Sequence, residues 1–438
     1  MKFNLIVILA AMSFTTFAQL TKQEKKIISF VDTRNAEALK LLEEAVNINS
    51  GTMNFEGVRK VGELFKVKLD ALGFVTKLTD GKPFGRAGHL VAEHKGKAGG
   101  KTILLIGHLD TVFELSSPFQ KFKMINDSTA MGPGIADMKG GDVLMIQALQ
   151  ALNDAGLLKD MNIIIVMTGD EEHSGRPLEL SKKDLMDAAR AADIAIGFED
   201  GDGNTATAVV SRRSSSGWEL KVTGVPAHSS QIFTEPIGAG AIYEASRILI
   251  EFYKELSVEP NLTFNPGVFL GGTSIEHNAP MNGGNAYGKS NVVSKDAIIT
   301  GDIRAMSPEQ LANTQKVMKE IVARHLPMTD ATITFDEGYP PLAPTDGNNE
   351  LLSLFDKTSR DLGFGRVEAV KPRNAGAADI SFTAGLVDMA LDGVGLGSTG
   401  GHTVNETANL KSLTMQAKRT AILLYRLNNI TISVGNKR

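Results

Sequence analysis

The fold of this chain is decided in residues 161–175, which read MNIIIVMTGDEEHSG. Ile163 to Met167 form a short apolar run, as expected of a strand buried on both faces of a parallel sheet. The run ends in the polar sequence from Thr168 to Glu172, and ligands of open α/β sheets bind just outside the carboxyl ends of strands. The adjacent carboxylates have two interpretations. They form either a solvated acidic turn or a metal site, with one carboxylate as ligand and the other as base.

The composition narrows the choice of chemistry. A length of 438 residues suggests roughly two or three domains. The net charge of -4 argues against a nucleic-acid or membrane-surface partner, because no basic excess exists to neutralise phosphates. The chain has no cysteine. A metal site must therefore use His, Asp and Glu, and no disulfide is available in an oxidising compartment.

The first 18 residues are expected to be a secretory signal peptide. A positive start at Met1-Lys2 precedes a mostly apolar run, and Thr16-Phe-Ala18 resembles a small-residue cleavage site. The apolar run is too short to span a bilayer comfortably. We expect an exported protein, periplasmic or secreted, that keeps no membrane contact after cleavage; the alternative is an uncleaved anchor.

Further polar clusters follow other expected strands and turns. The apolar run Thr102–Gly107 leads into His108-Leu-Asp110, a Gly-rich turn carries Asp137, and residues 194–198 lead into Glu199. Helices between these segments give the alternation of a doubly wound α/β sheet. The expected helices are 22–48, 54–72, 142–152, 349–362 and 410–427.

The pattern of polar and apolar residues changes near Arg212, and residues 214–224 alternate polar and apolar side chains. Expected elements then follow in the order strand, helix, strand, strand, helix, strand, which is a compact α+β unit. We therefore interpret residues 214–327 as an insertion into a catalytic domain made of 19–213 and 328–438. The expected elements of this α+β unit are 214–224, 236–256, 262–270, 292–304, 307–325 and 331–336, the last of which follows the boundary at 327.

The candidate metal ligands and their neighbours occur in sequences that resemble a known family. The matching stretches are Gly107–Val112, Gly134–Gly141, Thr168–Glu172, Phe198-Glu199, Gly224–Ser230, Asn291–Val293 with Asp302-Ile-Arg304, and Gly400-Gly-His402. Together they are similar to the di-zinc exopeptidases that include bacterial glutamate carboxypeptidases, aminoacylases and succinyl-diaminopimelate desuccinylases. The resemblance implies a zinc-exopeptidase-like doubly wound mixed sheet with an inserted lid and dimerisation domain.

The resemblance also implies roles for individual residues. Two zinc ions per chain would share Asp137, with His108 and Glu199 on one ion and Glu172 and His402 on the other. Glu171 would be the general base, and Asp110 would hold the His108 ring. From the insertion, His228 would reach the site of a partner subunit in a homodimer, while Asn291 and Arg304 would bind substrate. All of these roles are implied by the resemblance alone.

One segment departs from the family's pattern. Residues 275–289 form a polar, Gly-rich excursion that is longer than the resemblance leads us to expect, so substrate specificity is open there. His277 within it is either a substrate contact or, as we favour, a surface residue. The remaining histidines are expected to be structural or solvated: His89, His94, His173 and His325.

Three functions fit these observations. The leading prediction is an exopeptidase that removes a C-terminal residue, glutamate carboxypeptidase-like, and the runner-up is an N-acyl amino-acid deacylase or dipeptidase with the same amide hydrolysis. The substrate is accordingly a peptide or an N-acyl amino acid. A catalytically inactive relative serving as a binding protein is the third, but its mark would be lost ligands, and all five positions and Glu171 are present.

Overall fold

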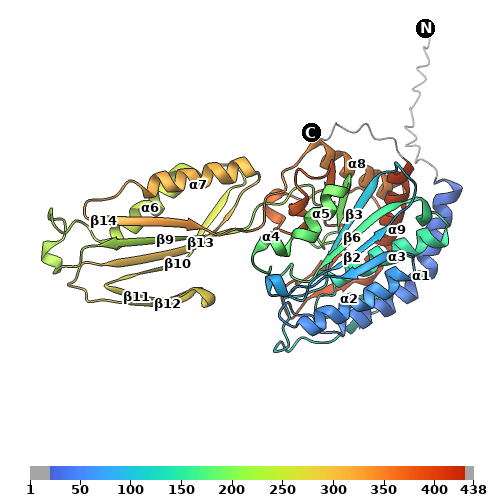
Figure 1. The fold of residues 1–438 in the computed structure, drawn as a ribbon, viewed down its shortest axis with the longest axis horizontal. Coiled ribbons are helices and arrows are strands. Elements are labelled where there is room, and N and C mark those ends of the chain that lie inside the picture. Colours follow the sequence, from blue (N-terminus) through green and yellow to red (C-terminus); the bar gives the residue numbers. More distant parts are fainter. Residues whose placement is uncertain (1–19, 430–438) are drawn as a thin grey trace, which may run out of the picture.

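The computed structural model describes residues 20–429 and has two lobes (Figure 1). The expected signal peptide, residues 1–18, lies outside the described residues. The larger lobe is built on a six-stranded sheet with the order β1-β2-β6-β3-β7-β16. Its strands are β1 (Val75–Leu78), β2 (Leu90–His94), β3 (Thr102–His108), β6 (Asn162–Thr168), β7 (Ile194–Gly197) and β16 (Met389–Leu391).

The central strands are parallel, as their uninterrupted apolar runs predict. β3 lies between β6 and β7 and pairs parallel with both, while β1 and β2 add an antiparallel edge. The predicted mixed α/β sheet is therefore confirmed. The register sets His108 opposite Thr168, so the polar residues that follow β3 and β6 leave the sheet at the same edge.

Helices cover both faces of this sheet. Successive residues of a strand point to opposite faces. Leu105 and Ile165 pack against the helices on one face, while Leu104 and Val166 pack against the helices on the other face. The first face carries α1 (Lys22–Val46), α2 (Phe55–Asp70), α3 (Lys139–Asp154), α8 (Asp346–Asp361) and α9 (Leu410–Asn429); the second carries α4 (Leu178–Ser181) and α5 (Lys183–Ala191). Two helices begin three residues earlier than expected, because α3 starts at Lys139 and α8 at Asp346.

Small sheets shape the loops around the main one. A four-stranded sheet of order β17-β18-β5-β4 carries the chain on either side of His402, and β15 pairs with β8. None of these short strands was expected from the sequence. Their bounds are β4 (Lys123–Asn126), β5 (Thr129–Met131), β8 (Thr207–Ala208), β15 (Glu368–Ala369), β17 (Ser398–Thr399) and β18 (Thr407–Asn409).

The smaller lobe, which we call the lid, is an antiparallel sheet with two helices. The sheet order is β10-β13-β9-β14, and Trp218 lies in the core between sheet and helices. The elements are β9 (Ser216–Gly224), α6 (Ala241–Leu256), β10 (Thr263–Gly272), β13 (Asp296–Arg304), α7 (Pro308–Val322) and β14 (Thr329–Phe335). Figure 1 shows the helices on one face of the sheet and the hairpin β11–β12 on the other.

The lid differs from the expected insertion in three places. The expected boundary at residue 327 falls too early, because β14 is hydrogen-bonded to β9 and extends the sheet to Phe335. α6 begins at Ala241 and not at 236. The unusual 275–289 segment is ordered as a hairpin of β11 (Ser274–Asn278) and β12 (Gly283–Tyr287).

Two chain segments connect the lid to the larger lobe and lie side by side. Arg212 pairs with Leu342, and Ser215 pairs with Tyr339, through reciprocal backbone hydrogen bonds of 2.9–3.0 Å. We call residues 211–215 and 338–342 the linker strands. Because they are bonded to each other, the lid leaves and re-enters the larger lobe at one place.

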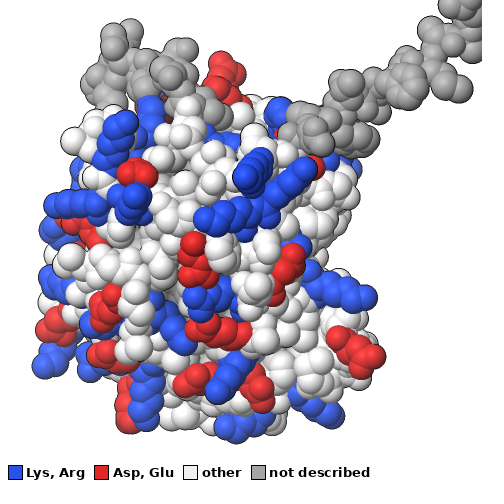
Figure 2. Space-filling model, turned by 90° about the vertical axis from the view of Figure 1, so that its right-hand side faces the viewer, with Lys and Arg blue, Asp and Glu red and all other residues white. Residues whose placement is uncertain are grey.

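The surface carries charges of both signs. On the face that Figure 2 shows, basic and acidic side chains are interspersed, and neither sign gathers into a large patch. Several form pairs one helical turn apart, such as Lys66 with Asp70 at 2.7 Å. Within residues 20–429, no helix has the length and apolar character needed to cross a bilayer.

Candidate metal centre

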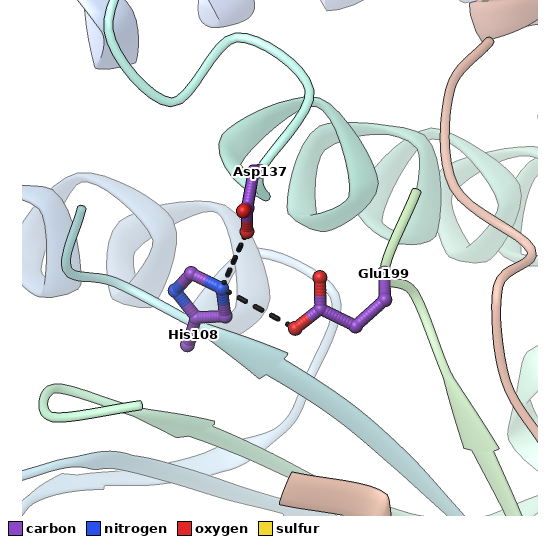
Figure 3. Close-up of side chains that lie close together, drawn as sticks. All are labelled: His108, Asp137 and Glu199. Atoms are coloured by element: carbon purple, nitrogen blue, oxygen red, sulfur yellow. Dashed lines mark hydrogen bonds and ion pairs between the residues drawn. The ribbon is translucent and has the colours of Figure 1, made fainter. Parts of the chain in front are cut away.

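The first group of candidate ligands meets at the carboxyl ends of β3 and β7. His108 is the last residue of β3, and its Nε2 lies 3.0 Å from Asp137 Oδ1 and 3.3 Å from Glu199 Oε1 (Figure 3). Asp137 comes from the turn that precedes α3, and Glu199 follows β7 by two residues. Three strand ends and turns thus supply one compact set of donor atoms.

The second group shares Asp137 with the first. Its other oxygen, Oδ2, lies 2.8 Å from His402 Nε2, and His402 Nε2 lies 3.3 Å from Glu172 Oε2. In each group the donor atoms all lie within 4.8 Å of one another. The five residues named as metal ligands from the sequence are therefore brought together, with Asp137 common to both groups.

Asp110 fixes several members of the cluster at once. Its carboxylate accepts hydrogen bonds from the backbone amides of Glu171 at 3.0 Å and Glu172 at 3.2 Å, and from the Thr52 hydroxyl at 2.6 Å. The Nδ1 of His108 lies 3.1 Å from the backbone carbonyl of Asp110 and 3.5 Å from its carboxylate. The ring is thus held mainly by the carbonyl, while the fully buried carboxylate organises the Glu-Glu turn.

Glu406 was not singled out from the sequence, yet it ties two of the ligand loops together. Its buried carboxylate accepts hydrogen bonds from the backbone amides of Gly134, Ala136 and Asp137, at 2.9–3.2 Å. Glu406 lies four residues after His402, so it joins the His402 loop to the Asp137 turn. The only sequence signal was its spacing from His402, and an isolated Glu in a polar loop ordinarily indicates a solvated side chain.

The electrostatics of the cluster favour a bound cation. Burial, with repulsion from Glu199, raises the pKa of Glu171 well above its usual value, and burial with repulsion from Asp137 does the same for Glu172. The pKa of Glu199 rises to about 7 for the same reasons. Burial opposes charge on His108, but Glu199 and its other acidic neighbours raise its pKa. The protein places more carboxylates here than its own cations can neutralise.

A second buried network lies behind Glu171. Lys182 is fully buried, and its Nζ lies 3.1 Å from Asp170 Oδ1 and 2.9 Å from Asp379 Oδ1. Thr168 donates a 2.5 Å hydrogen bond to Asp379, and the hydroxyl of Tyr339 lies 3.0 Å from that carboxylate. No sequence pattern indicated this network, because its members come from distant segments.

The lid residues predicted to act in catalysis do not join the cluster within one chain. His228 is exposed and bonds Ser230 at 2.8 Å, Asn291 is exposed, and Arg304 pairs with Asp302 at 3.1 Å. β9 has nine residues and starts next to a linker strand, so its far end lies on the order of 30 Å away from it. His228 follows that far end. His277 lies beside Glu219 at 3.6 Å and lines a cavity on the lid, away from the five ligands.

The donor set fits two divalent ions of the zinc type. Each group offers one imidazole Nε2 and carboxylate oxygens, which suit a catalytic zinc site that leaves a position open. The Nδ1 of His108 faces a backbone carbonyl, and such a contact fixes the tautomer that leaves Nε2 free for a metal. Burial and mutual repulsion raise the pKa values of Glu172 and Glu199, and a bound cation would offset both effects.

A two-lobed α/β fold whose strand ends gather histidines and carboxylates into two groups defines a metallohydrolase. The chain belongs to the peptidase family M20/M25/M40, whose family model matches residues 104–426. It is 24% identical over 394 residues to carboxypeptidase G2 of Pseudomonas sp. (strain RS-16), covering 89% of this chain and 88% of the relative. It is 28% identical over 228 residues to acetylornithine deacetylase of Pasteurella multocida (strain Pm70), covering 50% and 57%.

Solved structures share the fold. The M20 family metallo-carboxypeptidase Sso-CP2 of Sulfolobus solfataricus superposes with a TM-score of 0.64 at 17% identity, covering 90% of this chain and 100% of that one. The YXEP protein of Bacillus subtilis, described as a dinuclear metal-binding M20 peptidase, gives 0.63 at 15%, covering 92% and 99%. The aminopeptidase PepT of Bacillus cereus gives 0.68 at 19%, covering 90% and 98%. The predicted family and fold are confirmed.

Proposed function

We propose that this protein is a zinc-dependent exopeptidase that hydrolyses the amide bond of a C-terminal residue, as a glutamate carboxypeptidase does. The observation that carries the proposal is the pair of ligand groups joined by Asp137, with Glu171 beside them. The similarity to carboxypeptidase G2, which extends over 89% of this chain, supports cleavage at the C-terminal end of the substrate.

In this proposal, His108, Asp137 and Glu199 would hold one zinc ion, and Asp137, Glu172 and His402 would hold the other. Such ions would supply Lewis acidity and lower the pKa of water toward ~7. Glu171 is not a member of either ligand group, so its carboxylate is free to take a proton from the attacking water. It then delivers that proton to the leaving amine, a role typically worth ~10²–10⁴ in rate.

The lid supplies the remaining contacts. Arg304 has a planar guanidinium suited to a bidentate grip on a carboxylate, and a C-terminal residue presents one. Asn291 adds a polar contact to substrate. His228, whose exposed ring stands at the far end of the lid, stabilises the oxyanion of the tetrahedral intermediate in the active site of a second subunit.

The homodimer that this requires has a suitable surface on the lid. β10 is an edge strand of the lid sheet, and an edge strand can pair with another chain. Large apolar side chains are exposed on the neighbouring α6 and on β10: Ile242, Tyr243, Ile250, Tyr253 and Phe269, each 40–65% exposed. A twofold axis beside β10 would bury them and join two lids into one continuous sheet.

The runner-up function is an N-acyl amino-acid deacylase or dipeptidase. The similarity to acetylornithine deacetylase over half of this chain favours it as the alternative. The bond and the site chemistry are the same, and only the group on the acyl side differs. We further propose that residues 1–18 direct export and are removed, which places the mature enzyme in the periplasm or outside the cell.

A substrate panel separates these functions. Zinc-loaded protein is assayed with peptides ending in glutamate, with N-acetyl amino acids and with dipeptides, each beside its C-terminally amidated twin. Hydrolysis of the free acids but not of the amides is expected, with peptides ending in glutamate cleaved fastest. Equal rates on acid and amide would exclude a C-terminal exopeptidase, and a preference for N-acetyl amino acids would establish the deacylase.

A further inference from the structure

The general base is held by its backbone alone. Within residues 20–429, no protein group donates a hydrogen bond to the Glu171 carboxylate or forms an ion pair with it, which leaves it free to act. Its amide donates to Asp110 at 3.0 Å, and its carbonyl oxygen lies 3.0 Å from the hydroxyl of Tyr339. The place of the carboxylate in the site therefore depends on these two anchors.

Tyr339 differs from Asp110 in where it comes from. Asp110 follows the last residue of β3 by two positions, whereas Tyr339 is part of a linker strand, with its backbone paired to Ser215 at 2.9–3.0 Å. Its hydroxyl is the contact that crosses from this linker strand to the Glu-Glu turn.

The ring of Tyr339 is fixed on several sides. It packs edge to face against Phe382 at a centroid distance of 4.9 Å, and the Nζ of Lys182 lies 5.3 Å from its centroid. Asp379, 3.0 Å from the hydroxyl, is itself held by Lys182. Burial and the neighbouring carboxylates raise the pKa of Tyr339 well above its usual value, which keeps the hydroxyl protonated and able to donate.

We propose that Tyr339 is a positioning residue that sets the place of Glu171 and ties it to the linker between the lid and the catalytic domain. This inference rests on the proposed role of Glu171 as general base. The residue touches neither ligand group and acts through the Glu171 backbone, the Ser174 hydroxyl at 3.1 Å and Asp379. Its effect on the reaction is therefore on the orientation of the base and not on the binding of substrate or metal.

The variant that tests it is Tyr339→Phe, which keeps the ring packing and removes only the hydroxyl. We expect kcat to fall by ~10–100-fold, because displacing a reacting group by about 1 Å costs up to ~10². KM should change by less than about threefold, and zinc content should stay that of the wild type. Tyr287→Phe is the matched control, since it removes a hydroxyl bonded to Glu276 at 3.2 Å on the lid hairpin.

A double mutant with a substitution at Glu171 distinguishes loss of positioning from a general loss of folding or stability. In a Glu171→Asp background, whose carboxylate is already displaced, Tyr339→Phe should lower kcat by much less than it does in the wild type. Two residues acting through one group give such non-additive effects. Full multiplication of the two losses, or a kcat of Tyr339→Phe within twofold of the wild type, would overturn the proposal.

A readout without substrate keeps this test separate from the proposed function. Hydrogen exchange measured by mass spectrometry should become faster at residues 169–175 in Tyr339→Phe, while α9 keeps its protection. If no substrate in the panel is hydrolysed, the proposed function fails but exchange still reports whether Tyr339 holds the turn. Unchanged exchange at 169–175 would show that it does not.

Discussion

The catalytic domain and the lid arrange their candidate functional residues in opposite ways. In the catalytic domain, His108 and Asp110 are buried to 1% exposure or less, and every candidate ligand, the exposed His402 included, has its partners in the same chain. In the lid, His228 and Asn291 are exposed and touch none of those residues. The predicted metal ligands are therefore brought together by the fold of a single chain, whereas the proposed roles of the lid residues would need a second chain or a movement of the lid.

Inside the catalytic domain, the largest expected difference between two mutations is that between substitutions at the adjacent residues Glu171 and Glu172. Glu171→Gln should lower kcat by ~10²–10⁴ or more, because it removes the base while zinc content stays near two ions per chain. Glu172→Gln should lower zinc content, because that residue belongs to a ligand group. Metal analysis after dialysis, beside kinetics, measures both. The reverse pattern would exchange the two roles, and a fully active enzyme with one ion per chain would end the two-metal assignment.

A complementation experiment tests whether the lid acts on another chain. His228→Ala is expected to lower kcat by ~10²–10³, the usual cost of losing an oxyanion donor. If Glu171→Ala and His228→Ala chains are unfolded together and refolded, about half of the dimers are mixed, and each mixed dimer has one intact site. About a quarter of the wild-type activity should then return. No recovery, despite demonstrated subunit exchange, would place His228 in its own site or outside catalysis.

The smallest expected effect concerns Glu406, which holds the ligand loops without being a ligand. Glu406→Gln replaces one acceptor oxygen with an amide NH2 group, which is itself a donor and faces backbone donors, so the Asp137 turn should loosen. Zinc affinity is expected to fall by ~10–100-fold, as for other residues that orient ligands. Competition with a chelator measures it, and Glu63→Gln on the exposed surface of α2 is the control. Unchanged affinity would show that the preorganisation of the centre does not depend on Glu406.

The sequence predicted those parts of the site that follow apolar strands. The runs before His108, Glu172 and Glu199 identify buried parallel strands, and the parallel arrangement places their carboxyl ends together. His402 follows no such run. It lies in a loop between two short strands with a left-handed φ of 59°, so only the family resemblance indicated it.

Other features depend on contacts between distant segments, which local patterns do not encode. Lys182 and Asp379 are 197 positions apart in the chain yet pair at 2.9 Å, and neither occurs in a distinctive motif. The predicted insertion ends at residue 327, although the sequence also predicts a strand at 331–336. The pairing of β14 with β9 shows that this strand belongs to the lid and that its sheet continues to Phe335.

The paired linker strands have a consequence for how such a protein can arise and change. Because the chain departs at Ser215 and returns beside it at Tyr339, the catalytic fold is interrupted at a single point on its surface. Domain insertions are tolerated best where the two ends of the inserted piece lie close together. A single genetic splice could add, remove or exchange the lid while the catalytic domain keeps its sheet, its helices and the five candidate ligands.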